Sequence, residues 1–388
     1  MIYLDNAATS FPKPPRVAAA ICGFLNEIGA SPGRSGHRLS VEAARIVYDA
    51  REKVAELFGF ADALRVIFCS NATEGLNLAI MGLLKPGDHV ITSSMEHNSV
   101  MRPLRRQEAA GVEVSVARCS ASGFLDPADV KKLIKNNTSL IVINHASNVT
   151  GSILPVGEIG KIAREREILM LVDAAQTGGC YPVDLEKECI DMLAFTGHKN
   201  LCGPPGTGGL IIGTRVDTGK LAPIMTGGTG SRSEHEYQPD FLPDRYESGT
   251  PNAAGIAGLG AGLQFVLDLG VERIMEHEQM LAKRLIDGLK GIEGASIYGG
   301  GDPEEQTATV SFNIGEMTPS EVAQRLDEDY DIMCRPGLHC APSAHRTIGT
   351  FPDGAVRFSM GYFNTPDEMD SAISAVRDLA RKSGHKSA

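Results

Sequence analysis

From residue 40 onward, short apolar runs alternate with longer segments whose apolar residues recur at helical spacing. The runs have the length of buried strands, and the longer segments have the period of amphipathic helices. Ser40 stands where the first helix needs a capping residue. Strands are predicted at 66–68, 89–92, 112–117, 140–144 and 169–172, and helices at 41–58, 73–84, 100–110, 127–134 and 156–166. This alternation predicts an α/β fold with a mostly parallel sheet flanked by helices.

The pattern changes after Thr226. Residues 227–251 are polar, rich in glycine and only weakly periodic, which predicts a long loop. Beyond it, helices are predicted at 254–269, 273–289, 320–326 and 366–382, and short strands at 296–298, 309–312 and 356–358. We therefore expect a large domain over residues 15–254 and a smaller C-terminal α/β domain over residues 255–388, with residues 1–14 packed against the small domain.

Composition narrows the class of protein. Of the 388 residues, 42% are hydrophobic and 22% charged, the balance of a globular protein with a sizeable core. The formal net charge of −11 argues against a nucleic-acid partner, because phosphate binding depends on Lys and Arg. The start of the sequence does not resemble a signal peptide, and the longest apolar run is far shorter than a membrane span. We expect a cytoplasmic protein with no membrane partner.

The eight cysteines form no C-x-x-C pair, and a chain of this length can build its core without disulfides. We expect reduced thiols that are mostly buried as small hydrophobes. Cys22 and Cys69 lie in apolar segments of that kind. We expect no metal site.

Polar side chains follow several of the predicted strands. Asp173 ends one strand, and Lys199 closes the motif Thr-Gly-His-Lys at 196–199, which follows another apolar run. His97 and Asn148 follow two further strands. Each has an ordinary explanation when taken alone, since an Asp at a strand end is often a turn former and a lone His is more often structural. Because ligands gather at the carboxyl ends of parallel strands, their coincidence points to a binding site.

Two further segments add to this set. Residues 69–77 place Ser, Asn and Thr at the start of a helix, which is either an ordinary N-cap or an anion site favoured by the helix dipole. Lys199, flanked by small residues, is not placed like a solvated lysine, and a desolvated amine can form a Schiff base. The glycine run at 203–209 lacks the Gly-Lys-Ser/Thr of a nucleotide P-loop. An anion cradle, a flat ring, an amide, a carboxylate and a lysine together are what pyridoxal phosphate (PLP) requires.

With these motifs in place, the chain resembles the fold-type-I, class V PLP enzymes of the cysteine desulfurase and selenocysteine lyase family. The resemblance extends from Tyr-Leu-Asp-Asn-Ala-Ala at 3–8 to Arg-Phe-Ser-Met at 357–360, and it includes Ser-Asn-Val at 147–149 and Asp-x-x-Gln at 173–176. It implies PLP as the cofactor and sulfur metabolism, including iron–sulfur cluster assembly, as the setting.

The resemblance also implies a role for each matching residue. Lys199 would form the Schiff base, His97 would stack on the ring and act in acid–base chemistry, and Asp173 would hold the ring nitrogen. Asn148 and Gln176 would hold the side of the ring that carries its oxygen. The phosphate would be bound by Ala72, Thr73, Thr196 and His198, with Thr250 supplied by the partner subunit of a homodimer.

The segment at 334–342 bears on the reaction. Its ordinary explanation is a Gly/Pro-rich loop with an incidental thiol. Cys340, however, lies beside His339 and close in sequence to Arg335, a setting that favours an exposed thiolate. The segment resembles the persulfide-forming loop of the short-loop, group II desulfurases. This implies that Cys340 takes the sulfur of L-cysteine and passes it to an acceptor protein, with Arg357, Asn148 and Arg335 binding the substrate.

Three possibilities stay open at this point. The first is a cysteine desulfurase or selenocysteine lyase, which Cys340 in its motif favours. The second is another class V enzyme, such as an aminotransferase or epimerase, in which Cys340 is incidental. The third is a non-catalytic protein that retains the fold, against which Lys199, Asp173 and Asn148 argue.

Overall fold

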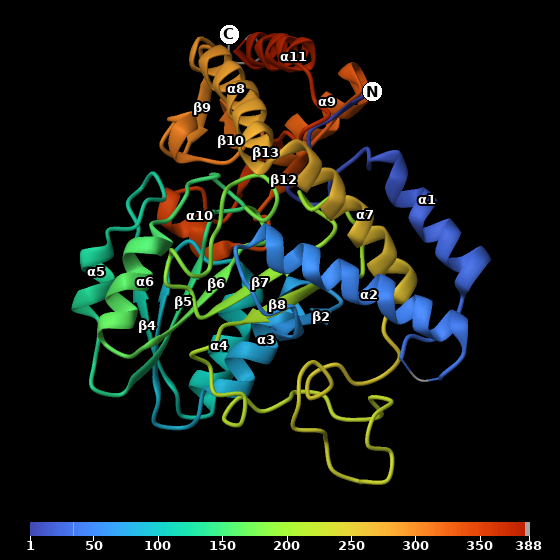
Figure 1. Ribbon diagram of the computed structural model, residues 1–388. Helices are drawn as coiled ribbons and strands as arrows, with labels where there is room; N and C mark the ends of the chain where they lie inside the picture. The colour runs from blue at the N-terminus through green and yellow to red at the C-terminus, as the bar shows by residue number, and fades with distance from the viewer. Residues whose placement is uncertain (34, 385–388) are drawn as a thin grey trace.

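The computed structural model describes residues 1–33 and 35–384. Its largest element is a seven-stranded sheet in the order β2-β8-β7-β6-β5-β3-β4 (Figure 1). The strands are β2 (Val66–Cys69), β3 (His89–Ser93), β4 (Glu113–Ala117), β5 (Thr138–Asn144), β6 (Leu169–Asp173), β7 (Met192–Thr196) and β8 (Gly208–Ile212). Every neighbouring pair is parallel except the two pairs that β8 makes, so the predicted, mostly parallel sheet is confirmed.

Strand β8 is absent from the sequence prediction because it begins with two of the glycines in the run at 203–209. The reason for those glycines is packing rather than turning. A Cβ atom on Gly208 would lie 2.7 Å from the Cα atom of Asn71 and 2.7 Å from the carbonyl oxygen of Phe195. A residue without a side chain is therefore needed where β8 passes between its neighbours.

Helices cover both faces of this sheet. One face is covered by α2 (Arg38–Leu57), α5 (Pro127–Lys132), α6 (Val156–Glu165) and α7 (Ala253–Leu269), and the other by α3 (Ala72–Leu83) and α4 (Asn98–Ala109). Strand β5 shows why both faces are apolar. Its Ile141 and Ile143 belong to the apolar core under α2, α5, α6 and α7. Its Leu140 and Val142 belong to the core under α3 and α4, as the two-residue period of a strand requires.

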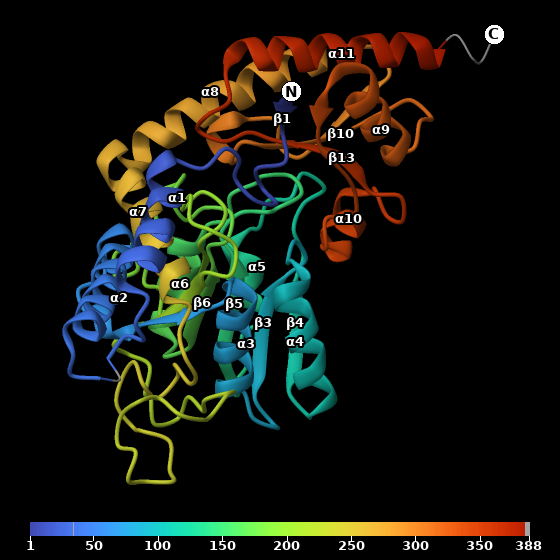
Figure 2. The ribbon, with the colours of Figure 1, turned by 90° about the vertical axis from the view of Figure 1, so that its right-hand side faces the viewer.

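A second, four-stranded antiparallel sheet lies above the carboxyl edge of the first (Figure 1). Its order is β12 (Arg335–Gly337), β13 (Ala355–Ser359), β10 (Thr309–Ile314) and β9 (Ala295–Tyr298). Helices α8 (Val271–Lys290), α9 (Pro319–Tyr330) and α11 (Pro366–Gly384) share its apolar core, and α11 runs along the outer side of the molecule (Figure 2). Helices α1 (Pro15–Gly23) and α10 (Pro342–Ile348) and strand β12 are further elements that the sequence pattern does not predict.

The first residues of the chain lie among the last. Strand β1 (Ile2–Tyr3) pairs in parallel with β11 (Ile332–Met333), and Leu4 belongs to the apolar core of the second sheet. Helix α7 packs on α1 and α2, and α8 continues from it at an angle of 82° toward the second sheet. The division into domains at residues 254 and 255 stays a prediction. Within residues 1–33 and 35–384, no single helix is long and apolar enough to cross a membrane, although α7 and α8 taken together pass that test.

The start of α2 corrects one expectation. The helix begins at Arg38 rather than Val41, and its cap is His37, whose Nδ1 accepts a hydrogen bond from the Ser40 N–H at 3.3 Å. Ser40 is buried inside the first turn, where its hydroxyl donates to the Ser31 carbonyl oxygen at 2.8 Å. A histidine ring nitrogen has taken the role that the sequence pattern assigned to the serine.

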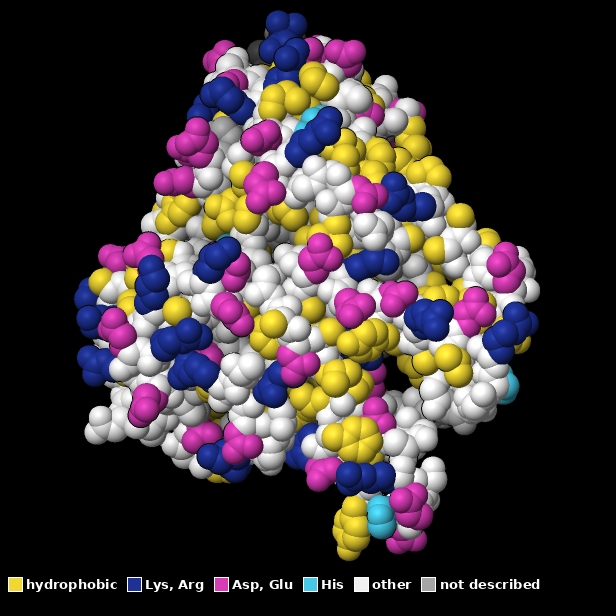
Figure 3. Space-filling model, viewed as in Figure 1, with side chains coloured by type: hydrophobic (Ala, Val, Ile, Leu, Met, Phe, Trp, Pro, Cys, Tyr) yellow, Lys and Arg dark blue, Asp and Glu magenta, His cyan; other side chains and the backbone are white. Residues whose placement is uncertain are grey.

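The long loop predicted at 227–251 is confirmed. All residues from 213 to 252 are described, and none of them lies in a helix or strand. The segment projects from the lower side of the molecule in Figure 1, and the side chain of its Tyr237 is 89% exposed. On the face seen in Figure 3, acidic and basic side chains are interspersed over the rest of the surface.

One buried ion pair attaches this loop to the body of the protein. The Arg51 guanidinium on α2 contacts both carboxylate oxygens of Glu247, at 2.7 and 2.9 Å, and only 4% of the arginine side chain is exposed. Glu247 also accepts a hydrogen bond from the Phe68 N–H, at 2.6 Å. The loop is therefore held against α2 and β2 by a charge-assisted, two-point contact.

We expect Glu247→Ala to lower the free energy of unfolding by about 3–5 kcal/mol, because it leaves the buried Arg51 guanidinium without its carboxylate. Urea unfolding measures this change. Asp240→Ala is the matched control, since Asp240 pairs with Arg232 in the same loop but is 75% exposed, and there we expect less than about 1 kcal/mol. Equal losses in the two variants would contradict the assignment.

Candidate active site

A cavity of about 310 Å³ lies at the carboxyl edge of the large sheet. All of the predicted site residues line it except Cys340 and Thr250. The lining predicted residues are Ala72, Thr73, His97, Asn148, Asp173, Gln176, Thr196, His198, Lys199, Arg335 and Arg357. Most follow strand ends of the large sheet or lie at the N-termini of the helices that follow those strands, while the two arginines come from the second sheet. The second sheet therefore contributes one wall of the cavity.

Lys199 lies in the loop that connects β7 to β8. Burial lowers the pKa of its amine to about 8; Asp173 acts in the opposite direction, and the positive charges of Arg357 and Arg335 lower it further. The N-terminal segment holds this loop, since the Ser10 hydroxyl donates to the Lys199 carbonyl oxygen at 2.7 Å. A lysine with this pKa is partly uncharged near neutral pH and can act as a nucleophile or base.

Asp173, Ser99 and His97 form a chain of contacts across the floor of the cavity. Burial raises the pKa of the Asp173 carboxyl, while the Ala175 N–H and the nearby Lys199 act in the opposite direction. The Ser99 hydroxyl lies 3.5 Å from Asp173 Oδ2 and 2.8 Å from His97 Nδ1. Asp173 is a carboxylate in a buried place that calls for a positively charged or hydrogen-donating partner.

His97 is held in one tautomer. Its Nδ1 accepts a hydrogen bond from the Ser99 N–H at 3.0 Å, which places the ring proton on Nε2. Burial lowers the pKa of the ring to about 4, with a further contribution from the positive charge of Lys199. Near neutral pH, His97 is therefore a neutral ring on the cavity wall.

Several polar groups in the cavity are left for a ligand. Thr196 Oγ1 and Asn148 Oδ1 are buried and have no hydrogen-bond partner within the described residues. Helix α3 begins at Ala72, with Asn71 as its cap, so that its N-terminus and Thr73 face the cavity. A buried carboxylate, two unpaired oxygens and a helix N-terminus in one cavity fit a flat heterocycle with a ring nitrogen and a phosphate, which is the structure of PLP.

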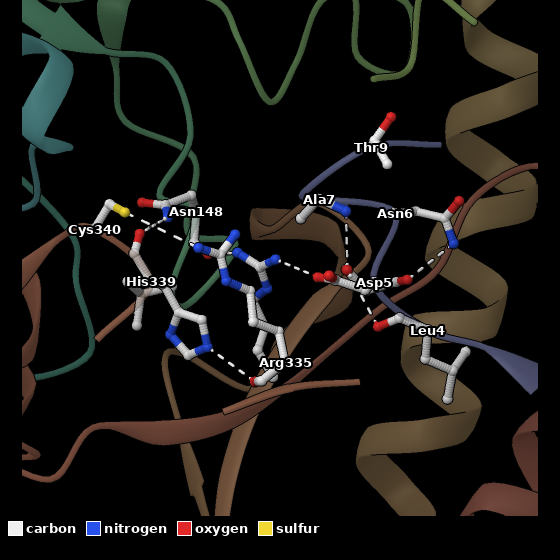
Figure 4. A network of polar contacts seen from close by, with 12 residues as sticks. Leu4, Asp5, Asn6, Ala7, Thr9, Asn148, Arg335, His339 and Cys340 are labelled. Carbon is white, nitrogen blue, oxygen red and sulfur yellow. Dashed lines mark hydrogen bonds and ion pairs between the residues drawn. The ribbon is translucent and has the colours of Figure 1, made fainter. Parts of the chain in front are cut away.

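The two arginines lie at the end of the cavity that the second sheet lines. Arg335, labelled in Figure 4, lies opposite Arg357 in the register of β12 and β13. The Arg357 Nη2 contacts Asp5 Oδ1 at 2.7 Å, and its Nη1 donates to the Asn148 carbonyl oxygen at 2.9 Å. Asp5 pairs with Arg357 alone, so the two neighbouring guanidinium groups leave an excess of positive charge, which suits a carboxylate ligand.

Cys340 lies beside the cavity on a left-handed turn, with φ angles of 49° at His339 and 57° at Cys340. Its thiol is exposed and lies 4.0 Å from Arg335 Nη2. The turn is anchored from both sides, because the Asn148 amide donates to the His339 carbonyl oxygen at 2.7 Å and the Asn98 N–H donates to the Cys340 carbonyl oxygen at 2.9 Å. The backbone of the cysteine is thus fixed while its sulfur reaches solvent.

His339 does not provide the positive charge that its position in the sequence suggests. The ring is buried, and burial lowers its pKa to about 3, with a further contribution from Arg357. Its two nitrogens contact the Arg335 carbonyl oxygen at 3.0 Å and His345 Nε2 at 3.3 Å. His339 shapes the turn as a neutral ring, and the positive charge near Cys340 comes from Arg335.

Thr250 lies outside this cavity. It is exposed and lines a separate cavity of about 510 Å³, together with Arg51 and Glu247. Its own chain therefore does not bring it to the other site residues, and the predicted phosphate contact requires a second subunit.

The cysteines are free, as expected, but the expectation that most of them are buried is wrong, because only Cys180 and Cys202 are buried. Cys22 is exposed because it lies on the outer side of α1, a helix that the pattern did not predict, and Cys69 is only partly buried. Sequence reasoning also missed Ser99 and Asp5 as contributors to the site. Ser99 could have been found as a polar residue just before a predicted helix, whereas nothing local in the sequence connects Asp5 with Arg357.

Comparison with known proteins gives the class that this fold and site define. The family model described as Aminotransferase class-V matches residues 2–371. The chain therefore belongs to the class V aminotransferase family, and its α/β architecture is the fold-type-I arrangement of PLP enzymes.

The individual relatives carry a more specific name. A probable cysteine desulfurase of Methanothermobacter thermautotrophicus is 36% identical over 98% of this chain and 94% of its own length. A cysteine desulfurase of Haloferax volcanii is 34% identical over 98% of this chain and 90% of its own length. The apo structure of a cysteine desulfurase from Thermococcus onnurineus superimposes with a TM-score of 0.92 at 35% identity, covering 98% of this chain and 95% of that one.

Proposed function

We propose that this protein is a PLP-dependent cysteine desulfurase, which converts L-cysteine to L-alanine and retains the sulfur as a persulfide on Cys340. The observation that carries the proposal is Cys340 itself, an exposed thiol fixed at the rim of a cavity that also holds Lys199 and two arginines. An aminotransferase has no use for a thiol in that place. The relatives named cysteine desulfurase over the full length of the chain support the same reaction.

We assign PLP to the cavity by the donor set. Lys199 would carry it covalently, Asp173 would pair with the ring nitrogen, and the neutral ring of His97 would lie against the cofactor ring. Asn148 and Gln176 would bind the ring oxygen. The phosphate would be bound by Ala72, Thr73, Thr196 and His198. When bound, PLP supplies an electron sink for the Cα atom of an amino acid.

The residues of the chain then perform three tasks on L-cysteine. Arg357 and Arg335 bind the α-carboxylate, which fixes the direction of the side chain toward Cys340. The amine of Lys199, with its pKa of about 8, holds and moves the Cα proton near neutral pH. The thiol of Cys340, which is exposed beside the cavity, receives the sulfur.

The sulfur step is a thiolate attack. Sγ of Cys340 attacks Sγ of the substrate, so that a new S–S bond forms as the substrate Cβ–Sγ bond breaks. The electron pair of the broken bond stays with Cβ, which takes up a proton, and the carbon skeleton leaves as alanine. Two thiols thus yield one persulfide and one alanine without an external oxidant. The persulfide is then available to a sulfur-acceptor protein.

Lys199 can be tested as the residue that attaches PLP. Purified protein loaded with PLP should absorb visible light, and borohydride reduction should fix the cofactor on Lys199, because its amine is the nucleophile that faces the cavity. Peptide mass spectrometry identifies the labelled residue. Lys199→Ala should lose the covalent label, whereas Lys13→Ala, which removes another lysine of depressed pKa, should keep it. A label on any lysine other than Lys199 would refute this assignment.

Cys340 can be tested as the residue that accepts the sulfur. Cys340→Ser removes the nucleophile and keeps the shape of the turn, so alanine formation from cysteine should fall at least about a hundredfold while cysteine still binds. Cys22→Ser, which changes another exposed cysteine outside the site, is the matched control and should keep full activity. In the parent protein, mass spectrometry after incubation with cysteine should find one added sulfur on Cys340. In Cys340→Ser, we expect cleavage of cysteine to be lost and cleavage of selenocysteine to survive in part, because selenium is the better leaving group.

Undiminished cysteine desulfuration in Cys340→Ser would point instead to another class V reaction. In that case the thiol would be incidental, and transamination or epimerisation of an amino acid should be measured on the same preparation.

We also propose that the protein is a homodimer in which Thr250 of each subunit reaches the phosphate end of the partner's cavity. The exposure of Thr250 and the large cavity beside it support this arrangement. Thr250→Ala should then weaken PLP retention by about tenfold to a hundredfold, the loss of one hydrogen bond to a charged group. Spectrophotometric PLP titration measures this, and sedimentation gives the oligomeric state. A shared site would be excluded if the protein sediments as a monomer and Thr250→Ala retains PLP as tightly as the parent protein does.

A further inference from the structure

Two guanidinium groups lie opposite each other where the second sheet lines the cavity, which we call the carboxylate end because the proposed function places the substrate carboxylate there. Arg335 and Arg357 are register partners on β12 and β13, and both line the cavity. Like charges directly opposite each other on a sheet are unfavourable. Burial also lowers the pKa of the Arg357 guanidinium, which Asp5 opposes. The pair therefore needs an anion, and the carboxylate that contacts Arg357 in the structure is Asp5 (Figure 4).

The position of Asp5 is set by the backbone. Asp5 forms a parallel bridge with Ser359, two residues beyond Arg357 on the same strand. On either side of it, the Leu4 N–H donates to the Met333 carbonyl oxygen at 2.8 Å, and the Asn6 N–H donates to the Ser359 carbonyl oxygen at 3.2 Å. The N-terminal segment is thus bonded both to β11 and to the end of β13, and it presents Asp5 to Arg357 at a fixed place.

Asp5 contacts Arg357 from outside the cavity. Asp5 is not among the described residues that line the cavity, and 23% of its side chain is exposed, against 1% for Arg357. The arginine uses Nη2 toward Asp5 and Nη1 toward the Asn148 carbonyl oxygen, while its buried Nε–H has no partner within the described residues. Both terminal nitrogens of the guanidinium are therefore held, and because Arg357 lines the cavity, its remaining N–H groups are left for a ligand there.

We infer that Asp5 is a positioning residue for substrate recognition, which holds the Arg357 guanidinium in the orientation that receives the α-carboxylate of an amino acid. The inference rests on the proposed function, because that function assigns the carboxylate to Arg357. Two guanidinium charges and one Asp charge leave one positive charge, which matches a single carboxylate. A guanidinium fixed in advance loses less freedom when the ligand binds.

Two variants of Asp5 separate position from charge. Asp5→Glu keeps the charge but moves it by one methylene, whereas Asp5→Asn keeps an acceptor oxygen in place and removes the charge. The ligands are L-alanine and ethylamine, which differ only in the carboxylate. Binding of each to the PLP-loaded protein is followed through the visible absorbance, so that no turnover is needed.

We expect Asp5→Glu to weaken L-alanine binding roughly fivefold to tenfold, the equivalent of a disturbed hydrogen bond to a charged group, and to leave ethylamine binding unchanged. Asp5→Asn should recover most of that loss and remain within about threefold of the parent protein. Asp331→Asn is the matched control, because Asp331 pairs with the Met1 amino group on the same N-terminal segment without contacting Arg357. Asp331→Asn should leave the binding of both L-alanine and ethylamine unchanged.

Other results overturn the inference. If the variants bind L-alanine and ethylamine more weakly by the same factor, Asp5 acts on the fold as a whole. If Asp5→Asn binds L-alanine more tightly and Asp5→Glu binds it as the parent protein does, only the charge of Asp5 matters. Unchanged binding in both variants would remove the role altogether. If the parent protein gives no absorbance change with L-alanine or ethylamine, the proposed function itself fails, which distinguishes that failure from one confined to Asp5.

Discussion

The site depends on the direction of the strands in the large sheet. Because β3, β5, β6 and β7 run parallel, their carboxyl ends meet at one edge, where the backbone turns away and side chains of neighbouring strands converge. Asp173 and Thr196 end two of these strands, and His97 follows a third. None of these residues is close to the others in sequence, so the convergence follows from strand direction. Only β8 departs from it, and β8 supplies no side chain to the cavity.

Charge is distributed unevenly along the cavity. The end formed by the large sheet holds the buried Asp173, and the end formed by the second sheet holds Arg335 and Arg357. Lys199 lies under the influence of both, since Asp173 raises its pKa and the arginines lower it. This polarity suits a ligand with a positive charge at the end near Asp173 and a carboxylate at the end near the arginines.

Local patterns predicted the elements whose signals lie within one segment. The alternation of strands and helices predicted the large sheet, and Asp173, His97 and Lys199 were identified because each ends or follows an apolar run. What the sequence could not provide depends on distant packing. The glycines of β8 resemble a turn, although close neighbours require them, and the capping role of His37 depends on where the preceding chain passes. The contact of Asp5 with Arg357 joins opposite ends of the chain.

That last contact bears on the order in which the molecule is made. The strands of the large sheet are complete once residue 212 has left the ribosome, but β1 has no partner until β11 is synthesised, and Asp5 has none until β13 follows. Strand β1 and Asp5 therefore stay without these partners until β11 and β13 have been synthesised. The carboxylate end of the cavity is consequently the last part of the site to form, and a chain released early would carry Lys199 and Asp173 without it.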